Sequence, residues 1–554
     1  MNRGRGVASR AYDAVVVGGG HNGLVAAFYL ARAGRSTLVL ERRPFVGGAC
    51  VTEGFAPGFR ASTGAYVLSM LRDGIWHDMA LVRRGIRVDP AGPSLHVFAD
   101  GARLMLHDEM EPTLEEIARF SKRDSLAYPV FEARLASIAQ AVAPAFDWPP
   151  PDPAIGSAAA LRSLGRYARL ALAHRGLIGE AAFLFTTSAT RLLDEWFDSD
   201  HVKAAIGWHA INDSLQGPSA PGTAYVLLHD HAADVTGPAV RSWGFVRGGM
   251  GTLTAVMADA VRDAGGEVRT DANVERILVD GGRAVGVALS DGEEIAAGQV
   301  LSNADPQRTF LRLVDETDLP APFLQQIRGY RCEGTSMKIN LALERLPGLA
   351  GHPAGLQPYH AGIMEFGSTL ADMDRDQALA RRGEAAEDSH VEICFPTVHD
   401  PSLAPAGRHI MTIDVNSQPY ALRGGWDGIR DRRADQVIGQ LERSFPGLSG
   451  SILHRQVLSP LDLERVLGLT GGHALHGEMT PDQLWFMRPV RGWANYRTPI
   501  RDLYLCGAGT HPGGGVTGAN GRNAARQALR DAARRRFDRR SLVRAGRRKE
   551  GGPW

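Results

Sequence analysis

Features that would place this chain in several common classes are scarce or missing. Its 554 residues include only 4 cysteines, and no two of them have the C-x-x-C spacing. This argues against a redox dithiol, a zinc ribbon and a disulfide framework, and it fits a reducing, cytosol-like compartment. No apolar run reaches about 18 residues, so we expect no transmembrane helix. No internal repeat is visible.

Net charge is also small. The formal total is +1, which indicates no nucleic-acid or other strongly charged partner. The total hides an asymmetry, because residues 530–549 contain ten Arg or Lys against two Asp. We favour a solvated, loose tail for this stretch, since terminal segments are usually poorly ordered. The alternative is peripheral contact of this basic tail with an anionic membrane surface or an acidic partner.

The N-terminal segment has the pattern of a βαβ unit. Residues 12–17 are apolar and predict a buried parallel strand, and a glycine-rich turn follows at 18–23. A helix is expected over 22–33, where Gly34 ends it. Residues 36–40 then predict a second strand. Strand, turn, helix and strand within about 30 residues are typical of a nucleotide-binding unit.

The turn at 18–23 satisfies G-x-G-x-x-G. Gly18 permits the tight turn, Gly20 lets the backbone approach a pyrophosphate, and Gly23 allows close packing of helix on strand. The helix that starts near Asn22 offers free N–H groups to phosphate. Glu41 follows Gly23 by 18 residues, at a strand end, where its carboxylate can accept ribose hydroxyls.

A second glycine-rich loop, 507–518, follows an expected core strand at 503–506. It also contains G-x-G-x-x-G, but no strand ending in an acid follows about 20 residues later, so we reject a second dinucleotide site. By its likeness to the flavoprotein family described below, we interpret it as a loop that closes over a flavin ring. A helix N-terminus there favours the negative charge that the ring gains on reduction. The residues that we expect at the ring are Gly507, Gly515, Val516 and Thr517.

Other patterns divide the chain into two interleaved parts. Helices are expected at 114–120, 192–208, 252–264 and 522–533, and strands at 267–289 (with a hairpin turn at 280–282), 300–302, 336–343 and 409–415. We assign 11–105, 240–315 and 490–535 to a nucleotide-binding domain. Residues 106–239 and 316–489 then form a substrate domain, and 536–554 form the basic C-terminal tail.

These motifs together support a family resemblance over nearly the whole chain. The chain resembles phytoene-desaturase-like flavin oxidoreductases of the amine-oxidase/glutathione-reductase superfamily, with carotene ketolases as relatives. The segments that carry the likeness are 18–27, 193–198, 246–251, 396–405 and 507–523. Its nearest likeness is to a group named after pyridine nucleotide-disulfide oxidoreductases. The missing C-x-x-C and second fingerprint exclude a disulfide reductase of the usual design.

The resemblance implies an α/β fold: a Rossmann-like, glutathione-reductase-type FAD domain built from discontinuous segments, with an inserted α+β substrate domain. It also implies that the extension after Glu41 serves FAD rather than NAD. In these flavoproteins E-x-R-x-x-x-G-G places Arg42 or Arg43 near phosphate and ribose, and it places Gly47 and Gly48 near the flavin. One of the two arginines can equally be a surface residue. Val274 resembles the residue whose backbone brackets the adenine, although a structural role is equally compatible with the pattern.

The implied reaction is dehydrogenation or desaturation of an apolar, isoprenoid or carotenoid-like substrate by hydride transfer to flavin. An allylic cation loses a proton easily, so no strong base is demanded. His511 is our candidate catalytic residue because it lies in the loop expected beside the ring, although a histidine bonded to backbone is the favoured alternative. For Lys338 we favour a surface position over one facing the ring. His229 and His231 lack a third ligand, so we expect no metal.

Three alternatives stay open: carotenoid ketolase-type oxygenation, amine oxidation, and a flavin-binding regulatory protein with little turnover. A single dinucleotide site makes oxygen, a quinone or a carrier protein the expected electron acceptor. The localisation that we expect is cytoplasmic, with the membrane periphery as the alternative. Neither the substrate nor the oligomeric state follows from the sequence.

Overall fold

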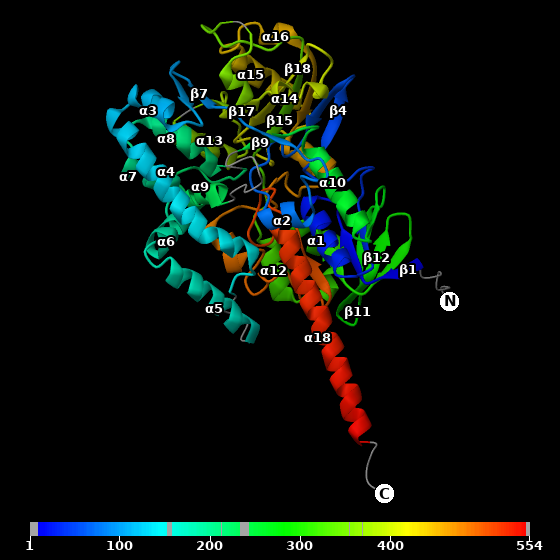
Figure 1. The fold of residues 1–554 in the computed structure, drawn as a ribbon. Helices are drawn as coiled ribbons and strands as arrows, with labels where there is room; N and C mark the ends of the chain where they lie inside the picture. The colour runs from blue at the N-terminus through cyan, green and yellow to red at the C-terminus, as the bar shows by residue number, and fades with distance from the viewer. Residues whose placement is uncertain are drawn as a thin grey trace.

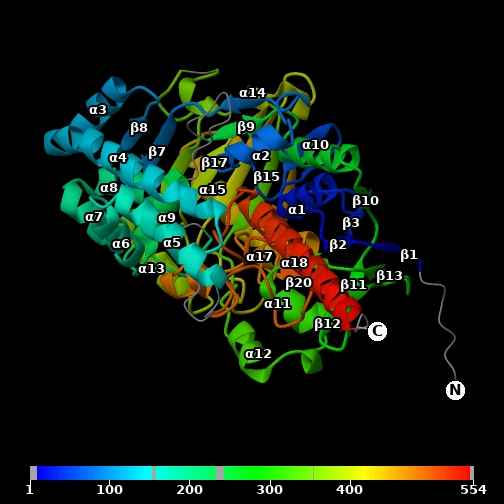
Figure 2. The ribbon, with the colours of Figure 1, turned by 60° about the horizontal axis from the view of Figure 1, so that its bottom comes forward.

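The computed structural model describes residues 9–151, 158–211, 213–232, 243–353, 355–367 and 369–549. A five-stranded parallel sheet is built from segments of the start, the middle and the end of the chain, and four of its strands are labelled in Figure 2, turned from the view of Figure 1. The strands in spatial order are β10 (Glu267–Arg269), β3 (Thr37–Leu40), β2 (Ala14–Val17), β14 (Val300–Ser302) and β20 (Leu503–Leu505). The fold therefore confirms the predicted α/β class with a discontinuous Rossmann-like domain.

Alternation along the central strands places the sheet between two apolar layers. Ala14 and Val16 of β2 pack on one face against the helices α1 (His21–Arg32), α10 (Met250–Asp263) and α18 (Ala519–Lys549). Val15 and Val17 pack on the other face against a four-stranded sheet. Because both faces of the sheet are covered, the sequences of these strands are continuous runs of apolar residues. The second sheet has the order β1 (Ser9–Tyr12), β13 (Glu294–Ala297), β12 (Arg283–Leu289) and β11 (Val274–Asp280).

A mixed seven-stranded sheet forms the base of the second part of the molecule, at the top of Figure 1. One of its faces packs on α15 (Arg430–Glu442) through a cluster of aliphatic and aromatic side chains. The strands in spatial order are β19 (Ile452–Leu458), β15 (Met337–Leu343), β18 (His409–Val415), β17 (Val391–Cys394), β16 (Met364–Gly367), β7 (Ser94–Phe98) and β8 (Arg103–Leu106).

A group of helices flanks this sheet, on the left of Figure 1 and of Figure 2. They enclose their own apolar cluster, which also includes residues of β7 and β8. Their bounds are α3 (Met110–Ala118), α4 (Lys122–Val142), η1 (Ala143–Asp147), α5 (Ala158–Ala173), α6 (Ile178–Thr186), α7 (Ala189–Trp196), α8 (Asp200–Gly207), η2 (Trp208–Ile211), α9 (Thr223–Ala232) and α13 (Leu370–Ala380).

The remaining elements are short and connect these layers. They are β4 (Thr52–Ala56), β5 (Phe59–Ser62), α2 (Asp73–Asp78), β6 (Val88–Pro90), β9 (Gly244–Val246), α11 (Pro306–Arg308), η3 (Thr309–Leu313), η4 (Glu316–Asp318), α12 (Ala321–Arg328), η5 (Pro358–Ala361), α14 (Pro396–His399), η6 (Pro401–Leu403), α16 (Leu448–Ser451), α17 (Pro460–Asp462), η7 (Leu463–Leu467), η8 (Pro481–Gln483) and η9 (Trp485–Met487). No helix within the described ranges is long and apolar enough to cross a bilayer.

Three expectations differ from the structure. The helix expected over 192–208 is broken after Trp196, and a new helix starts at Asp200 with Ser199 as its N-cap. Residues 94–105, assigned above to the nucleotide-binding segment 11–105, belong to β7 and β8 and their connection, and these strands pair with the seven-stranded sheet. The final helix α18 continues to Lys549, where a loose tail was expected from 536. The division into domains otherwise stays a prediction.

Candidate functional site

One cleft joins the two glycine turns that the sequence singled out. It is lined by both turns, by the end of β3 and by one face of the seven-stranded sheet. Most of the predicted cofactor residues line it, namely Gly18, Gly20, Asn22, Glu41, Arg42, Gly47, Gly48, Val274, Gly515 and Val516. Four others do not, namely Gly23, Arg43, Gly507 and Thr517. Their roles stay predictions, but the two turns share one site.

Backbone geometry explains the glycines of the first turn. A Cβ on Gly20 would lie 2.7 Å from Asn303 Nδ2, and a Cβ on Gly23 would lie 2.2 Å from the Gly18 carbonyl oxygen. Gly23 therefore acts by close packing behind the cleft. Gly20 also caps α1 without any side-chain hydrogen bond, which leaves the first N–H groups of the helix free to bind an anion.

Glu41 is held at the end of β3 by the turn itself. One carboxylate oxygen accepts the Gly19 N–H at 2.8 Å, and the other accepts the Arg43 N–H at 3.0 Å. The side chain is buried yet lines the cleft. Each oxygen keeps a further lone pair for a hydroxyl donor, so the carboxylate can bind a ribose.

The two consecutive arginines separate in the structure. Arg42 lines the cleft, donates to the Val466 carbonyl at 2.7 Å and lies near Arg308, which also lines it. Burial, followed by the charge of Arg308, lowers the pKa of Arg42. Arg43 instead pairs with Glu53 and lies over the Phe45 ring, 4.4 Å from its centroid. Arg42 is thus the arginine available to a ligand.

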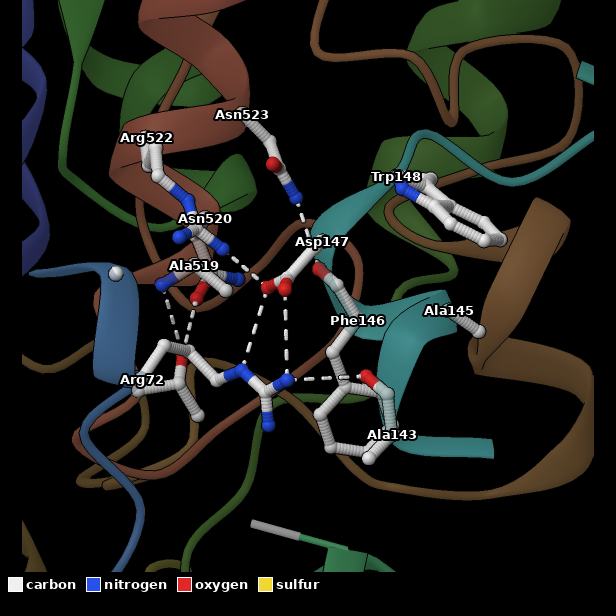
Figure 3. Close-up of polar contacts among 12 residues, drawn as sticks. Arg72, Ala143, Ala145, Phe146, Asp147, Trp148, Ala519, Asn520, Arg522 and Asn523 are labelled. Atoms are coloured by element: carbon white, nitrogen blue, oxygen red, sulfur yellow. Dashed lines mark hydrogen bonds and ion pairs between the residues drawn. The ribbon is translucent and has the colours of Figure 1, made fainter. Parts of the chain in front are cut away.

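The second turn is tied to the helical part by a network at the start of α18 (Figure 3). Asp147 of η1 accepts from Arg72 Nε at 3.2 Å and from Arg522. Asn523 Nδ2 donates to the Phe146 carbonyl at 2.9 Å. These contacts hold the loop 507–518 against η1 and fix the end of the cleft that the loop closes.

Arg488 supports the same loop from inside. It is fully buried and donates to the carbonyl oxygens of Leu475, at 2.8 Å, and Ala508, at 2.9 Å and 3.0 Å. Further bonds go to the Glu478 and Gln483 carbonyls. No sequence pattern marked this residue, because its partners are main-chain atoms scattered over two loops.

His511 does not line the cleft. Its Nε2 lies 3.0 Å from the Ala145 carbonyl oxygen, and its ring packs edge-on against Trp485. Burial lowers its pKa to about 4, so the imidazole is neutral at pH 7. This placement corresponds to the histidine bonded to backbone and does not favour a catalytic role. His229 is also buried, with Nε2 at 3.2 Å from the Gly514 carbonyl oxygen.

The expectation of a surface position for Lys338 was wrong. Lys338 lines the cleft and is only 6% exposed, because strand β15 is covered on both faces. Its Nζ lies 2.7 Å from Asp414 Oδ2 and 3.6 Å from the Tyr66 ring centroid. Glu392 lines the cleft beside this pair. The remaining wall is largely apolar and aromatic, with Val67, Met70, Trp208, Trp243 and Leu475.

The donor set fits a flavin dinucleotide. Arg42 and Arg308 face the cleft, and neither forms an ion pair with a carboxylate among the described residues, so both can pair with a diphosphate. The oxygen Asn22 Oδ1 is buried there without a protein partner. Gly20 leaves room where a side chain would stand. These features place a polyanion binder at one end of the cleft and an apolar chamber at the other.

Comparison with known proteins agrees with this geometry. Residues 23–529 match the model of the family described as flavin containing amine oxidoreductase, and the chain belongs to this family. It is an FAD-dependent oxidoreductase, which confirms the cofactor and the enzyme class expected from the sequence.

Three curated relatives cover nearly all of the chain. "Pyridine nucleotide-disulfide oxidoreductase domain-containing protein 2" of Rattus norvegicus is 38% identical over an alignment of 544 residues that covers 94% of each chain. A limonene dehydrogenase polypeptide of Castellaniella defragrans is 28% identical and also covers 94% of each chain. "Phytoene desaturase (lycopene-forming)" of a Paracoccus species is 26% identical over 92% of this chain and 95% of its own. The predicted resemblance to phytoene desaturases is confirmed.

Proposed function

We propose that this FAD-dependent oxidoreductase dehydrogenates an apolar, isoprenoid-like substrate. The observation that carries the proposal is the apolar and aromatic chamber beside the predicted flavin end of the cleft, formed by residues such as Met70, Trp208 and Trp243. Two relatives have names that refer to limonene and phytoene, both isoprenoid hydrocarbons. Such a chamber binds hydrocarbon through area removed from water.

Different residues of the chain then have different roles in this reaction. FAD, when bound, accepts two electrons and a hydrogen from a substrate C–H bond. Glu41 and Arg42 would hold the dinucleotide, and the first N–H groups of α1 would bind its phosphates. The aromatic wall excludes water and orients the substrate. Asp414, beside Lys338, provides a carboxylate in the same chamber that can receive a proton.

Anaerobic flavin reduction tests this proposal. Purified protein loaded with FAD is mixed, without oxygen, with a panel of monoterpene and carotenoid hydrocarbons and a lipid extract, and the oxidised flavin band is followed. Bleaching by a hydrocarbon, with a new double bond in the product, supports dehydrogenation. A keto product would show ketolase-type oxygenation instead, and bleaching by no compound would favour a regulatory flavoprotein.

Amine oxidation is the second candidate. The family description and the two carboxylates of the chamber, Asp414 and Glu392, favour it, since a carboxylate can bind an ammonium group. A panel of primary and polyamines, scored by peroxide formation in air, separates the two functions. The electron acceptor is open in both, with oxygen, a quinone or a carrier protein as the proposed classes.

We also propose contact with an anionic membrane surface, where such hydrocarbons dissolve. Helix α5 supports this better than the C-terminal tail alone. Leu161, Leu164 and Leu172 lie on one stripe of the helix and are 71%, 56% and 72% exposed. Three arginines, Arg162, Arg166 and Arg169, lie beside the stripe, and residues 158–179 contain no acid. Apolar residues flanked by cations are typical of an interfacial helix.

Vesicle co-sedimentation tests the membrane proposal. Binding to vesicles with phosphatidylglycerol, and weaker binding to pure phosphatidylcholine, is expected. Leu161→Ser with Leu164→Ser should release the protein, whereas Val82→Ser, which removes an exposed apolar residue outside α5, should not. Equal binding of both variants would refute a role for α5.

A further inference from the structure

Five titratable side chains form a row across neighbouring strands of the seven-stranded sheet. Lys338 is paired in register with Asp414, and Asp414 with Glu392. Glu392 is paired in turn with Glu365, and Glu365 with His96. Directly opposite residues project from the same face of a sheet, so these five side chains, which we call the titratable row, lie side by side.

The titratable row begins in the cleft and continues behind it. Lys338, Asp414 and Glu392 line the cleft, whereas Glu365 and His96 do not and are buried. The residues between them along each strand point to the other face, into the apolar cluster under α15. Burial of so many ionisable groups is costly unless they pair or change protonation. This free-energy cost indicates that the buried ionisable groups serve a function.

The carboxyl groups of the row have free acceptor positions. Asp414 Oδ1, Glu365 Oε1 and Glu392 Oε1 are buried and have no hydrogen-bond partner among the described residues. Burial raises the pKa of Glu392, with the charge of Asp414 adding to it, and burial likewise raises the pKa of Glu365. These two groups therefore hold a proton readily. Asp414 lies beside them, with its Oδ2 2.7 Å from Lys338 Nζ.

A second set of groups connects the row with the surface. His390 Nε2 lies 2.7 Å from Glu365 Oε2, and Asp376 of α13 is a buried carboxyl near His390. Asp376 lies 3.2 Å from Arg375, whose side chain is 59% exposed. Burial raises the pKa of Asp376 to about 6. His96 of β7 is paired in register with Glu365, and His209 of η2 lies near both of these residues.

We propose that the titratable row, with His390 and Asp376, carries protons that are released in the cleft, the substrate's proton among them, to the surface. The proposal rests on the oxidation proposed above. When a CH–CH unit becomes C=C, two C–H bonds break. One hydrogen leaves with its electron pair to the flavin, which is the oxidant. The other leaves as a proton to Asp414, and it passes through Glu392, Glu365 and His390 to Asp376 and water.

Proton transfer through the titratable row can be tested without knowledge of the substrate. Photoreduced, FAD-loaded protein is mixed anaerobically with ferricyanide in weak buffer containing a pH indicator. Reduced flavin then gives two electrons to two ferricyanide ions and releases one proton into the cleft, from which the row is expected to carry it to solvent. Flavin oxidation and proton release to solvent are followed separately. In Glu365→Gln, proton release should lag behind flavin oxidation and slow by at least about tenfold. The matched control is Glu344→Gln, at the exposed end of the same sheet.

Infrared difference spectra between oxidised and reduced protein give a second measurement. Protonated carboxyl bands that shift in D2O are expected in the natural protein, and Glu392→Gln and Glu365→Gln should each remove one of them. Should Glu365→Gln lose its flavin, His390→Gln replaces it. If the natural protein binds no FAD, the proposed function is refuted. Variants that bind flavin but keep the proton-release rate and the carboxyl bands of the natural protein would refute the proposed proton transfer and would leave the proposed function intact.

Discussion

Replacement of Gly23 by alanine tests the packing on which the dinucleotide turn depends. The added Cβ would stand 2.2 Å from the Gly18 carbonyl oxygen, a main-chain atom that no rotamer change can move away. An acceptable contact needs about 1 Å more, so α1 and the end of β2 must separate. That movement displaces the N–H groups at the start of α1 that we expect to face the phosphates.

The expected losses follow from this displacement. Overpacking of this kind costs about 1–3 kcal/mol of folding free energy. Loss of two hydrogen bonds to a charged phosphate adds about 3 kcal/mol or more to the free energy of FAD binding, and this weakens binding by about 100-fold or more. Flavin affinity should therefore suffer more than stability.

Flavin content and apoprotein titration measure the effect. Flavin absorbance released by denaturation gives the content, and fluorescence quenching during addition of FAD gives the dissociation constant. The matched control is Gly165→Ala on α5, where no atom lies within 4 Å of the new Cβ. This control should bind FAD normally and gain about 0.5–1 kcal/mol in stability. Normal flavin affinity in Gly23→Ala would show that the turn does not hold the cofactor.

Three further predictions concern buried groups. Arg488→Met should destabilise the protein by about 3–5 kcal/mol in urea unfolding and lower its flavin content, since several carbonyl oxygens lose their donor; an unchanged midpoint would contradict this. Asp376 has a raised pKa of about 6, so the folded state binds its proton more tightly, and stability should fall as the pH rises from about 4 to about 6. In Asp376→Asn, the decrease in the free energy of unfolding between pH 4 and pH 7 should be smaller by about 3 kcal/mol than in the natural protein. An equal decrease in both proteins would contradict this prediction. The 4 cysteines are buried and burial raises the pKa of each thiol, so none should react with a thiol reagent at pH 8 before unfolding, and rapid labelling of any would contradict the packing.

The sequence predicted local features well and distant ones poorly. The βαβ unit, Glu41 and the C-terminal turn were recognisable because each depends on residues close in the chain, and the structure brings these turns to one cleft. Lys338 was misplaced because an alternating strand pattern does not show what covers its polar face. Arg308, Arg488 and the titratable row had no sequence signal, since strand register and main-chain partners arise only when distant segments pair.

The interleaved origin of the central sheet has a consequence for biosynthesis. Strands β2, β14 and β20 come from the start, the middle and the last tenth of the chain, yet they are neighbours in space. A nascent chain that has not yet reached residue 503 has neither β20 nor the loop 507–518, which we expect to contact the flavin ring. FAD can therefore be enclosed only after residues 503–518 have left the ribosome, and a stop codon before residue 503 would yield an apoprotein.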